Sequence, residues 1–439
     1  MGNVAIREGI REALARGGSV LLTAPTGWGK TRVMLETAVE LARGGRRVGL
    51  FAPTLTLLVK KWPELLSLSP PSALLTAGAG QHCVYRWSYP QRHCPRCRLR
   101  RQPEGFQPPP VTTFEDLLRT TPEEVCSYWV QEAILHRYSV LLAHYGRLNK
   151  LLPLLHYIFV DEVHELFLPH MASIPLAEVA ELLGADPGEL TSVAVIKELA
   201  EASLAAPLDP AKEDKLMTLM QMLRRTCWIE EGDGGPLLTC MDTYALPSGR
   251  PVFAATATPP PGFPPPGWEV MEITPERKPK AYIIADMAFY YPEYQGAALL
   301  LWMIRRRFSD SRIAVFAVSS LRHVLEVNLP PGVELCRGGL FDAWGKMRVG
   351  VDLPDYDVAV VFWPSLHVSA RRRLRAEGRD PSVAELVQGV QLAGRVLRPR
   401  SGETLEDVLQ RRVVVFADAR FQRYADYLSR HFNVEELSP

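Results

Sequence analysis

Two short strings hold the side chains best suited to chemistry on a nucleoside triphosphate. Residues 24–31 read APTGWGKT, between an apolar run and a helix-like stretch. In such a strand–loop–helix context, Gly27 and Gly29 let the backbone turn its N–H groups toward phosphate, because neither residue has a Cβ. The Lys30 ammonium can reach the β- and γ-phosphates, and the Thr31 hydroxyl can ligate Mg²⁺.

The second string, VDEVH at residues 160–164, ends another apolar run. It presents Asp161 to a metal ion and Glu162 to a water molecule, as hydrolysis of a phosphoanhydride requires. A glycine-containing loop alone would be weak evidence. A loop and an acidic pair, each at the end of a strand, predict a site that binds ATP with Mg²⁺ and hydrolyses it.

The composition bounds the rest of the molecule. The chain has 439 residues, of which 47% are hydrophobic, and a net charge of +1 at pH 7. This length predicts about two to four domains, and so small a charge leaves only local features as evidence for nucleic acid. No apolar run reaches the roughly 18 residues of a membrane span, and no signal peptide is evident. We therefore expect a soluble, cytoplasmic protein with no membrane partner.

Nine apolar or β-branched runs alternate with helix-like stretches, which is typical of parallel sheets buried on both faces. We expect an α/β protein with two such sheets, divided by the proline-rich linker Thr256–Gly267. The first sheet would contain Ser19–Thr23, Arg47–Ala52, Tyr138–Ala143, Tyr157–Val160 and Pro251–Ala255. The second would contain Ala281–Ala285, Arg312–Val318, Val358–Trp363 and Val413–Ala417.

Two insertions interrupt the first predicted sheet. Residues 80–126 are rich in cysteine, arginine and proline, and residues 167–248 have the leucine spacing of a small helical subdomain. The predicted first domain therefore comprises residues 1–79 and 127–166, with its end and the linker at 249–275. The predicted second domain comprises residues 276–439.

The first insertion contains a candidate set of metal ligands: Cys83, Cys94, Cys97 and Cys126. A CxxC pair with two flanking cysteines favours a metal site over disulfides in an intracellular protein, and unligated thiols are the alternative. Thiolates are suitable ligands for zinc or for an iron–sulfur cluster. Because histidine is also a zinc ligand, the neighbouring His82 and His93 leave a zinc site as an alternative. The other cysteines are scattered, and we interpret them as unlinked thiols: Cys227, Cys240 and Cys336.

The stretch from His82 to Arg101 contains six arginines and no acidic residue. Arginines interleaved with aromatic residues suit a nucleic acid, because the guanidinium binds phosphate and the ring stacks on a base. The alternative is a solvated loop whose arginines only flank a metal. We favour nucleic acid, and the candidate contacts are Tyr85, Arg86, Trp87, Arg96, Arg98 and Arg100.

Residues 386–399 read LVQGVQLAGRVLRP. On a helix, Gln391, Arg395 and Arg398 would share one face, at i, i+4 and i+7. Two arginines on that face could act as fingers for a γ-phosphate. The alternative is an ordinary surface helix with salt bridges.

The order of these motifs resembles that of superfamily 2 helicases with two RecA-like domains. The series is APTGWGKT, FAPTLTLLVKKW, four cysteines, VDEVHEL, FAATATP, FAVSS, VGVDLPDYD and QLAGRVLRP. With its cysteines between FAPT and VDEVH, the chain is similar to the XPD/DinG iron–sulfur DNA helicases, as a short member. This resemblance implies a 4Fe–4S cluster on the four cysteines, and a reduced Arch domain in residues 167–248. It also implies a monomeric ATP-dependent DNA helicase that moves 5′ to 3′ on single-stranded DNA and unwinds forked DNA.

The resemblance also implies roles for single residues. Thr256 and Thr258 would couple the ATP site to the DNA strand, and Thr54 would contact the DNA backbone. Gly350 and Asp352 would link the second domain to nucleotide and DNA. The residues that would sense and stabilise the γ-phosphate are Gln391, Arg395 and Arg398.

Two other interpretations stay open at this point. The first is a zinc-containing ATPase that is stimulated by nucleic acid and translocates without unwinding. The second is a non-catalytic nucleic-acid-binding protein with a decayed ATP site. The presence of Lys30, Asp161, Glu162 and Arg395 argues against the second.

Overall fold

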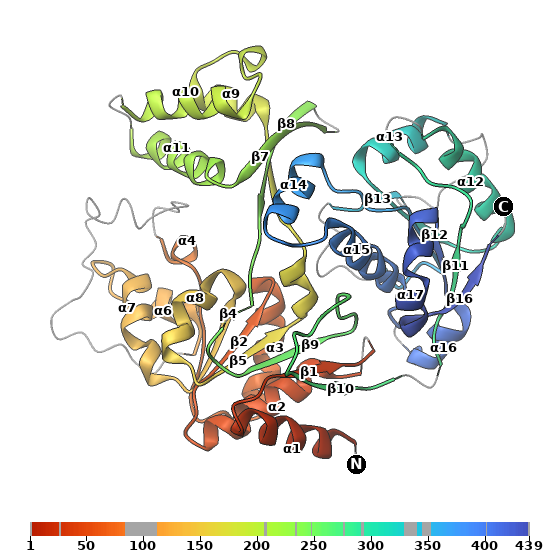
Figure 1. Ribbon diagram of the computed structural model, residues 1–439. Helices are drawn as coiled ribbons and strands as arrows, with labels where there is room; N and C mark the ends of the chain where they lie inside the picture. The colour runs from red at the N-terminus through yellow and green to blue at the C-terminus, as the bar shows by residue number, and fades with distance from the viewer. Residues whose placement is uncertain are drawn as a thin grey trace. The chain divides into compact units, whose positions relative to one another are not determined.

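A computed structural model describes the chain in residues 2–25, 28–83, 112–205, 209–232, 235–246, 248–274, 277–290, 294–328, 340–344, 353–400 and 402–437 (Figure 1). Contacts divide the chain into two compact units. The first unit comprises Met1–Leu22, Lys30–Thr256 and Pro264–Met271, and the second comprises Thr23–Gly29, Ala257–Phe263 and Glu272–Pro439. In these described ranges, no helix has both the length and the apolar character needed to cross a membrane.

The first large sheet has seven strands in the order β10-β1-β9-β5-β2-β4-β3. Strand β2 pairs in parallel with β4 and β5, and β5 pairs in parallel with β9. Every residue of β1, β2, β5 and β9 is buried, as expected for parallel strands covered on both faces. The strands are β1 (Val20–Thr23), β2 (Val48–Ala52), β3 (Ala73–Leu75), β4 (Val140–His144), β5 (Tyr157–Asp161), β9 (Val252–Thr256) and β10 (Glu269–Glu272).

Helices cover this sheet through their apolar faces. Helix α2 buries Val33, Met34 and Val39 against the sheet, and α1 packs on α2 and β9. The helices of this part are α1 (Gly2–Ala15), α2 (Lys30–Arg43), α3 (Leu55–Ser67), α4 (Ala79–His82), α6 (Phe114–Thr120), α7 (Ser127–Ile134) and α8 (Leu148–Leu151). Its short 3₁₀ turns are η1 (Leu135–Arg137), η2 (Tyr145–Arg147), η3 (Leu152–Leu154) and η4 (Val163–Phe167).

The insertion between β5 and β9 is only partly helical, so the prediction of a helical subdomain was wrong in part. Three helices pack on an antiparallel sheet with the order β6-β8-β7, and the three helices and the sheet share one apolar core (Figure 1). The leucine spacing of this stretch favoured a helical prediction and hid the pairing of β7 with β8, although the glycine-rich sequence EGDGG is itself a hairpin signal. The elements are β6 (His170–Pro175), α9 (Leu176–Leu183), η5 (Pro187–Glu189), α10 (Val193–Ala205), α11 (Pro210–Leu223), β7 (Thr226–Gly232) and β8 (Gly235–Asp242).

Two of the cysteines interpreted as unlinked thiols form a disulfide. Cys227 of β7 and Cys240 of β8 are bonded, and their Cα atoms are 4.0 Å apart. The antiparallel register places them directly opposite each other, which is why two cysteines 13 positions apart can meet. Our interpretation of these two residues was therefore wrong, and Cys336 lies outside the described residues.

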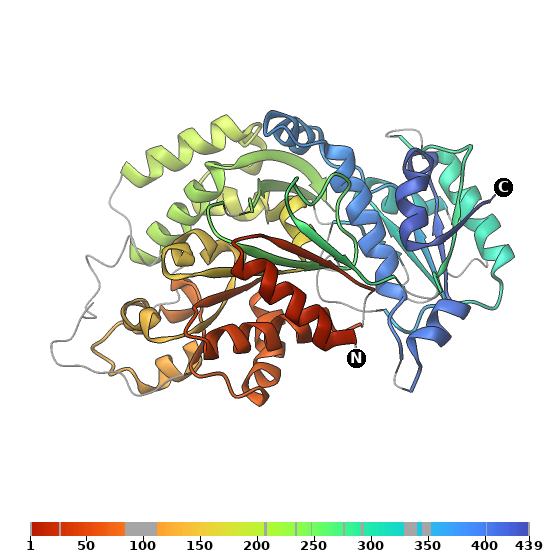
Figure 2. The ribbon, with the colours of Figure 1, turned by 60° about the horizontal axis from the view of Figure 1, so that its bottom comes forward.

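The second large sheet has six strands in the order β13-β12-β14-β15-β11-β16, and each neighbouring pair is parallel. Alternate residues of each strand point to opposite faces of the sheet, and their side chains belong to two apolar clusters. One cluster packs on α12 and α13, and the other on α15 and α17. Figure 2 shows the ribbon of this sheet with its helices. The strands are β11 (Lys280–Ile283), β12 (Ile313–Ala317), β13 (Leu340–Asp342), β14 (Val358–Val361), β15 (Val413–Phe416) and β16 (Asn433–Glu436). The helical segments are α12 (Gln295–Arg307), α13 (Ser319–Asn328), α14 (Val368–Ala376), α15 (Pro381–Val396), α16 (Leu405–Arg411), η7 (Ala419–Tyr424) and α17 (Ala425–His431).

The predicted α/β class with two parallel sheets is confirmed, and each of the nine predicted runs overlaps a strand. The proline-rich segment does not lead straight to the second sheet. It is followed by β10, an edge strand of the first sheet, and the chain enters the second sheet only at β11.

The disulfide predicts a measurable contribution to the stability of the insertion. Replacing Cys227 and Cys240 together by Ser should lower the unfolding free energy of this region by about 2–3 kcal/mol, because the bridge closes a short loop in the unfolded chain. Thermal unfolding of the variant should match that of the reduced wild type. If both thiols of the unreduced wild type react with an alkylating reagent, as judged by peptide mass mapping, the bridge is absent.

Candidate functional site

The loop before α2 has the backbone shape expected of a phosphate-binding turn at its last position. Gly29 adopts φ +102°, a region that residues with a Cβ rarely enter. Lys30 begins α2 and is only 7% exposed, so its ammonium is held near the end of the sheet. Gly27 lies outside the described residues.

The first turn of α2 meets the end of β5. The Thr31 hydroxyl donates a hydrogen bond of 3.0 Å to Oδ2 of Asp161. Burial, reinforced by the neighbouring Glu162, raises the pKa of Asp161 to about 6, although Thr31 and Lys30 oppose this change. A buried carboxylate and a hydroxyl in contact form a suitable pair of oxygen ligands for Mg²⁺, whose charge would favour the ionised carboxylate.

Glu162 occupies an unusual backbone conformation directly after the strand. Its φ and ψ angles are 52° and 51°, in the left-handed region. Its N–H donates a 3.1 Å hydrogen bond to Oδ1 of Asp161, and its carbonyl accepts one of 2.9 Å from the N–H of Glu165. The Glu162 side chain stays about one third exposed, so its carboxylate can reach a water molecule.

His164 connects the acidic string to the end of β9. Its Nδ1 lies 2.8 Å from the hydroxyl of Thr256 and 3.4 Å from Oε2 of Glu162. On the other side of the ring, Nε2 lies 3.5 Å from a carboxylate oxygen of Glu165. The first threonine of the TATP string is therefore in contact with the acidic string, as its proposed coupling role requires.

The second threonine of that string contacts α15. Gln391 donates a side-chain hydrogen bond to the hydroxyl of Thr258, and both residues belong to the second unit. Arg395 is 8% exposed, and its carbonyl accepts a 2.9 Å hydrogen bond from the N–H of Leu353. Gly350 and Asp352 lie outside the described residues.

The prediction that Arg398 shares a helical face with Gln391 and Arg395 was wrong. Helix α15 ends at Val396, so Arg398 lies beyond its last turn. The side chain of Arg412 binds the carbonyls of Val396 and Arg398 and thereby occupies acceptors at the end of the helix.

Comparisons with known proteins bear on this arrangement. No protein-family profile matches the chain, and no curated protein matches it. The structure of an XPD helicase matches over 99% of both chains, with 13% identity and a TM-score of 0.64. Xpd4 of S. tokodaii also matches over 99% of both chains, with 12% identity and a TM-score of 0.52. The chain has the fold of the XPD helicases. The predicted fold class of two RecA-like domains agrees with this likeness.

In this XPD-like fold, two of the four candidate cysteine ligands fall within the described residues. Cys83 follows α4, and Cys126 precedes α7. Hydrogen bonds join their neighbours, because the His82 ring lies 3.1 Å from the hydroxyl of Ser127 and 3.0 Å from Oε1 of Gln131. Cys94 and Cys97 lie outside the described residues. The two ends of the insertion are thus tied together at the positions that carry its outer cysteines.

His82 itself is a poor metal ligand in this arrangement. It is 1% exposed, and both of its ring nitrogens already have polar partners. Because Oε1 of Gln131 can only accept, Nε2 of His82 carries the proton and Nδ1 accepts from Ser127. Burial lowers the pKa of His82 to about 4, so the ring is neutral. Within the described ranges, no three His, Cys, Asp or Glu side chains gather in a metal-binding group.

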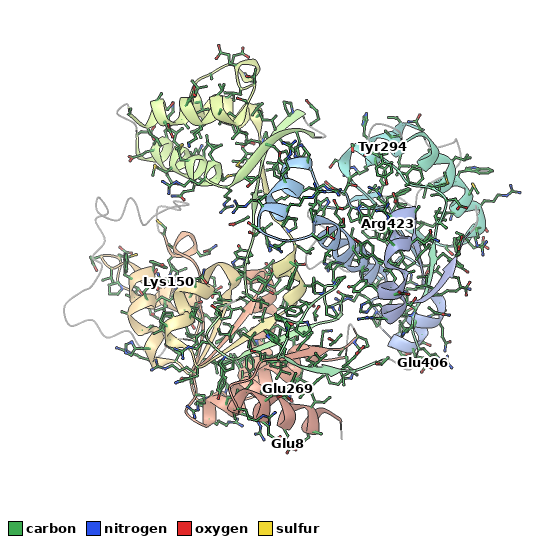
Figure 3. All side chains as sticks on the ribbon, viewed as in Figure 1. Glu8, Lys150, Glu269, Tyr294, Glu406 and Arg423 are labelled. Carbon is green, nitrogen blue, oxygen red and sulfur yellow. A yellow bond between two sulfur atoms is a disulfide. The ribbon has the colours of Figure 1, made fainter. Side chains whose placement is uncertain are left out.

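An ion-pair cluster centred on Glu132 of α7 braces the same region. Glu132 pairs with Arg147 at 2.6 Å and with Lys150 at 2.8 Å. Lys150 is labelled in Figure 3. The paired arginine also donates to the carbonyl of Ala77, and Gln131 binds the same backbone group. These contacts fix α7 against the chain that enters the insertion.

The residues proposed to contact nucleic acid are only partly described. Thr54 is the N-cap of α3, where its side chain accepts a 3.2 Å hydrogen bond from the N–H of Leu57. This places Thr54 at a helix start, a position at which backbone N–H groups can also receive phosphate. The remaining candidates all lie outside the described residues: Tyr85, Arg86, Trp87, Arg96, Arg98 and Arg100.

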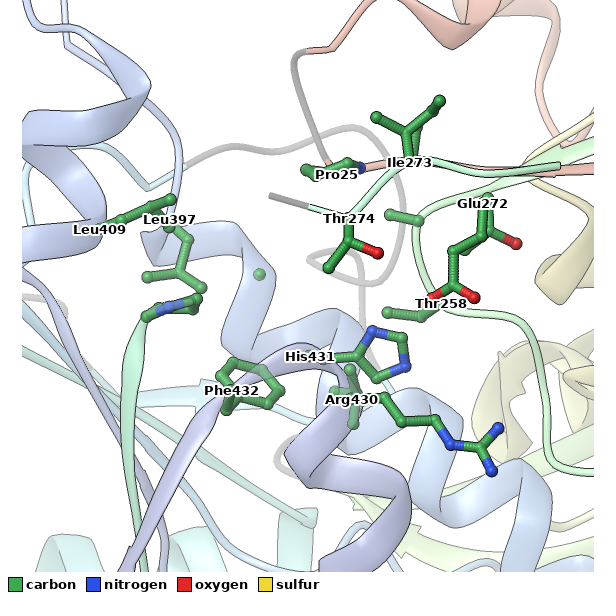
Figure 4. A pocket seen from close by; sticks show the side chains of 16 residues that line it. Pro25, Thr258, Glu272, Ile273, Thr274, Leu397, Leu409, Arg430, His431 and Phe432 are labelled. Carbon is green, nitrogen blue, oxygen red and sulfur yellow. The ribbon is translucent and has the colours of Figure 1, made fainter. Parts of the chain in front are cut away.

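A cavity of about 110 Å³ lies in the second unit, and its lining includes residues of three predicted motifs: Ala24 and Pro25, Thr258, and Gly394. Its walls are mostly apolar, with a few polar side chains around it (Figure 4). Those polar side chains include Thr258, Glu272, Thr274, Arg430 and His431. The His431 ring packs edge-on against Tyr427, and among the described residues its Nε2 has no hydrogen-bond partner.

His431 predicts a pH dependence of the stability of the second unit. Burial, with Lys278 and Arg430 nearby, lowers its pKa to about 4. Because the unfolded chain would bind a proton at this residue near pH 6.5, the folded state should lose up to about 3 kcal/mol as the pH falls from about 6.5 to 4. Replacing His431 by Gln should flatten the pH profile of unfolding in this window. Replacing the exposed His323 by Gln is the control and should leave the pH profile of unfolding unchanged. If unfolding of the His431 variant depends on pH as steeply as that of the wild type, the assignment is contradicted.

Proposed function

We propose that the protein is an ATP-dependent DNA helicase of the XPD type. The observation that carries this proposal is the contact between Thr31 and Asp161, with Lys30 and Glu162 on either side of it. It brings together the four groups that phosphate binding, metal binding and water activation need at one end of a parallel sheet. The likeness of fold to the XPD helicases supports the same proposal.

Each residue of the nucleotide site has a specific task in this proposal. Lys30 binds the β- and γ-phosphates of ATP, and the N–H groups of the glycine turn bind their oxygens. Thr31 and Asp161 would hold Mg²⁺, and the bound ion would supply positive charge beside the phosphates. Glu162 orients the attacking water and accepts its proton.

The second domain contributes the remaining groups of the proposed site. Gln391, Arg395 and Arg398 sense and stabilise the γ-phosphate, and Asp352 links this domain to the nucleotide. The burial of Arg395 fits a side chain held in one position. Because Arg398 follows the end of α15, its reach differs from that of a residue on the helix, and we expect Arg395 to make the larger contribution.

The proposed nucleic-acid substrate is single-stranded and forked DNA, with movement from 5′ to 3′ by a cytoplasmic monomer. Thr54 contacts the DNA backbone, and Thr256 and Thr258 couple that contact to hydrolysis. The arginines and aromatic residues between Cys83 and Cys126 contact DNA near the point where the strands separate.

We further propose that Cys83, Cys94, Cys97 and Cys126 hold one 4Fe–4S cluster. Thiolates are suitable ligands for iron, and the cluster would supply a rigid crosslink to the insertion. The hydrogen bonds that join His82 to Ser127 and to Gln131 support this assignment, because they connect the chain segments next to the outer cysteines. Zinc on the same four thiolates is the alternative.

The nucleotide site predicts different defects for two substitutions. Lys30→Ala should weaken ATP binding and abolish turnover, since it removes a phosphate ligand. Glu162→Gln should keep ATP binding but reduce turnover strongly, because the carboxylate acts on water and not on phosphate. Nucleotide affinity and DNA-stimulated hydrolysis should be measured for both variants. Normal turnover by Glu162→Gln would contradict the assignment.

The cysteine insertion predicts the metal content of the protein. Protein purified without oxygen should be brown and contain iron and acid-labile sulfide in nearly equal amounts. Cys97→Ser should remove the colour and impair strand displacement more than ATP hydrolysis, since the cluster would act away from the nucleotide. Stoichiometric zinc without sulfide in protein never exposed to oxygen would instead favour a zinc-containing ATPase.

A further inference from the structure

The first unit contains a buried tyrosine that no sequence motif marked. We propose that Tyr145 is a positioning residue that holds the backbone of Glu162 in its reactive conformation and connects it to the neck of the second insertion. The neck is defined here as His170, at the start of β6, and Tyr244, which follows β8. This inference rests on the proposed hydrolysis of ATP.

The hydroxyl of Tyr145 binds the backbone of the acidic string directly. It donates to the carbonyl of Asp161 and to that of Glu162, the second at 3.1 Å. Tyr145 begins η2 and is 2% exposed. A tyrosine hydroxyl keeps its proton at neutral pH, so it can donate to these carbonyls.

Glu162 needs such a contact because its backbone conformation is unfavourable. At φ 52°, a residue with a Cβ meets its own backbone more closely than in the right-handed or extended regions. If the peptide after Glu162 rotated to relieve this, its carbonyl would leave the Tyr145 hydroxyl and the side chain would change direction. The hydrogen bond therefore fixes where the Glu162 carboxylate points.

The ring of Tyr145 reaches the neck. It packs edge-on against Tyr244, with 6.0 Å between ring centroids, and Tyr244 packs in the same way on His170 at 4.7 Å. A second connection is polar, because Nε2 of His170 lies 3.1 Å from the carbonyl of Glu165 in η4. Both routes run from the neck to the turn that contains Glu162.

The neck connects the second insertion to the rest of the first unit. His170 pairs with Asp242 in the register of β6 and β8, so the neck is where the chain enters the insertion at β6 and leaves it after β8. A displacement of the insertion, such as DNA binding would cause, acts on these two rings. The inference is that the insertion influences hydrolysis through Tyr145 and does not need its own contact with nucleotide.

If Tyr145 only packed in the core, a different result would be expected. Loss of its hydroxyl would lower stability and leave the turnover of folded protein unchanged. Tyr157 provides the matched control, because it is buried at the start of the same strand, β5, and within the described residues its hydroxyl makes no hydrogen bond.

The test compares Tyr145→Phe, Tyr157→Phe and wild type as full-length protein. For Tyr145→Phe we expect kcat for ATP hydrolysis to fall about tenfold or more, with KM and the affinity for a fluorescent ATP analogue within about twofold of wild type. Tyr157→Phe should keep the wild-type kcat, and thermal unfolding of all three proteins establishes that they are folded. A wild-type kcat for folded Tyr145→Phe would overturn the positioning role.

The neck is tested with Tyr244→Ala and Tyr244→Phe. The alanine variant should lose most of the stimulation of hydrolysis by single-stranded DNA while keeping the unstimulated rate, and the phenylalanine variant should restore stimulation because it keeps the ring. Full stimulation of the alanine variant would contradict the link to the neck. A folded wild type without any ATPase activity would contradict the proposed function, and the inference would fall with it. An active wild type with a fully active Tyr145→Phe would contradict the inference alone.

Discussion

The hydrogen bond from Thr31 to Asp161 joins the two halves of the site, and the rest of the first unit is organised around it. It requires that α2 begin where β1 ends and that β5 end at the same edge of the sheet. The strand order β1-β9-β5 meets this requirement, since the carboxyl ends of parallel neighbours lie at one edge. The same order places Thr256, at the end of β9, between them, where His164 can reach it. A change in register at any of these strands would separate these groups.

The central strands of both sheets could be predicted from the sequence, whereas the edge strands could not. Strands such as β5 and β9 are buried on both faces, so they appear as continuous apolar runs. The edge strands β10 and β16 are mostly exposed, and β3 and β13 have only three residues each. Exposed or very short strands do not form continuous apolar runs, so their sequences gave little indication of a strand.

The candidate site shows a similar division. Lys30, Thr31, Asp161 and Glu162 belong to local strings whose spacing is fixed by a single turn, and such strings can be recognised in sequence. Tyr145 lies 17 positions before Glu162, and its role depends on how β4 and β5 are placed in the sheet. A contact of this kind has no local signature. The end of α15 before Arg398 does have a local signal, because Pro399 disfavours a helical conformation at the residue before it.

The Cys227–Cys240 bridge has a practical consequence for handling the protein. The proposed cluster needs four reduced thiols at one insertion, whereas the hairpin of the other insertion contains an oxidised pair. A strong dithiol reductant added to protect the first set would open the second. Anaerobic buffers without such a reductant satisfy both, because excluding oxygen preserves the thiolates and leaves an existing disulfide intact. Measurements made in the two kinds of buffer therefore describe two covalent forms of the chain.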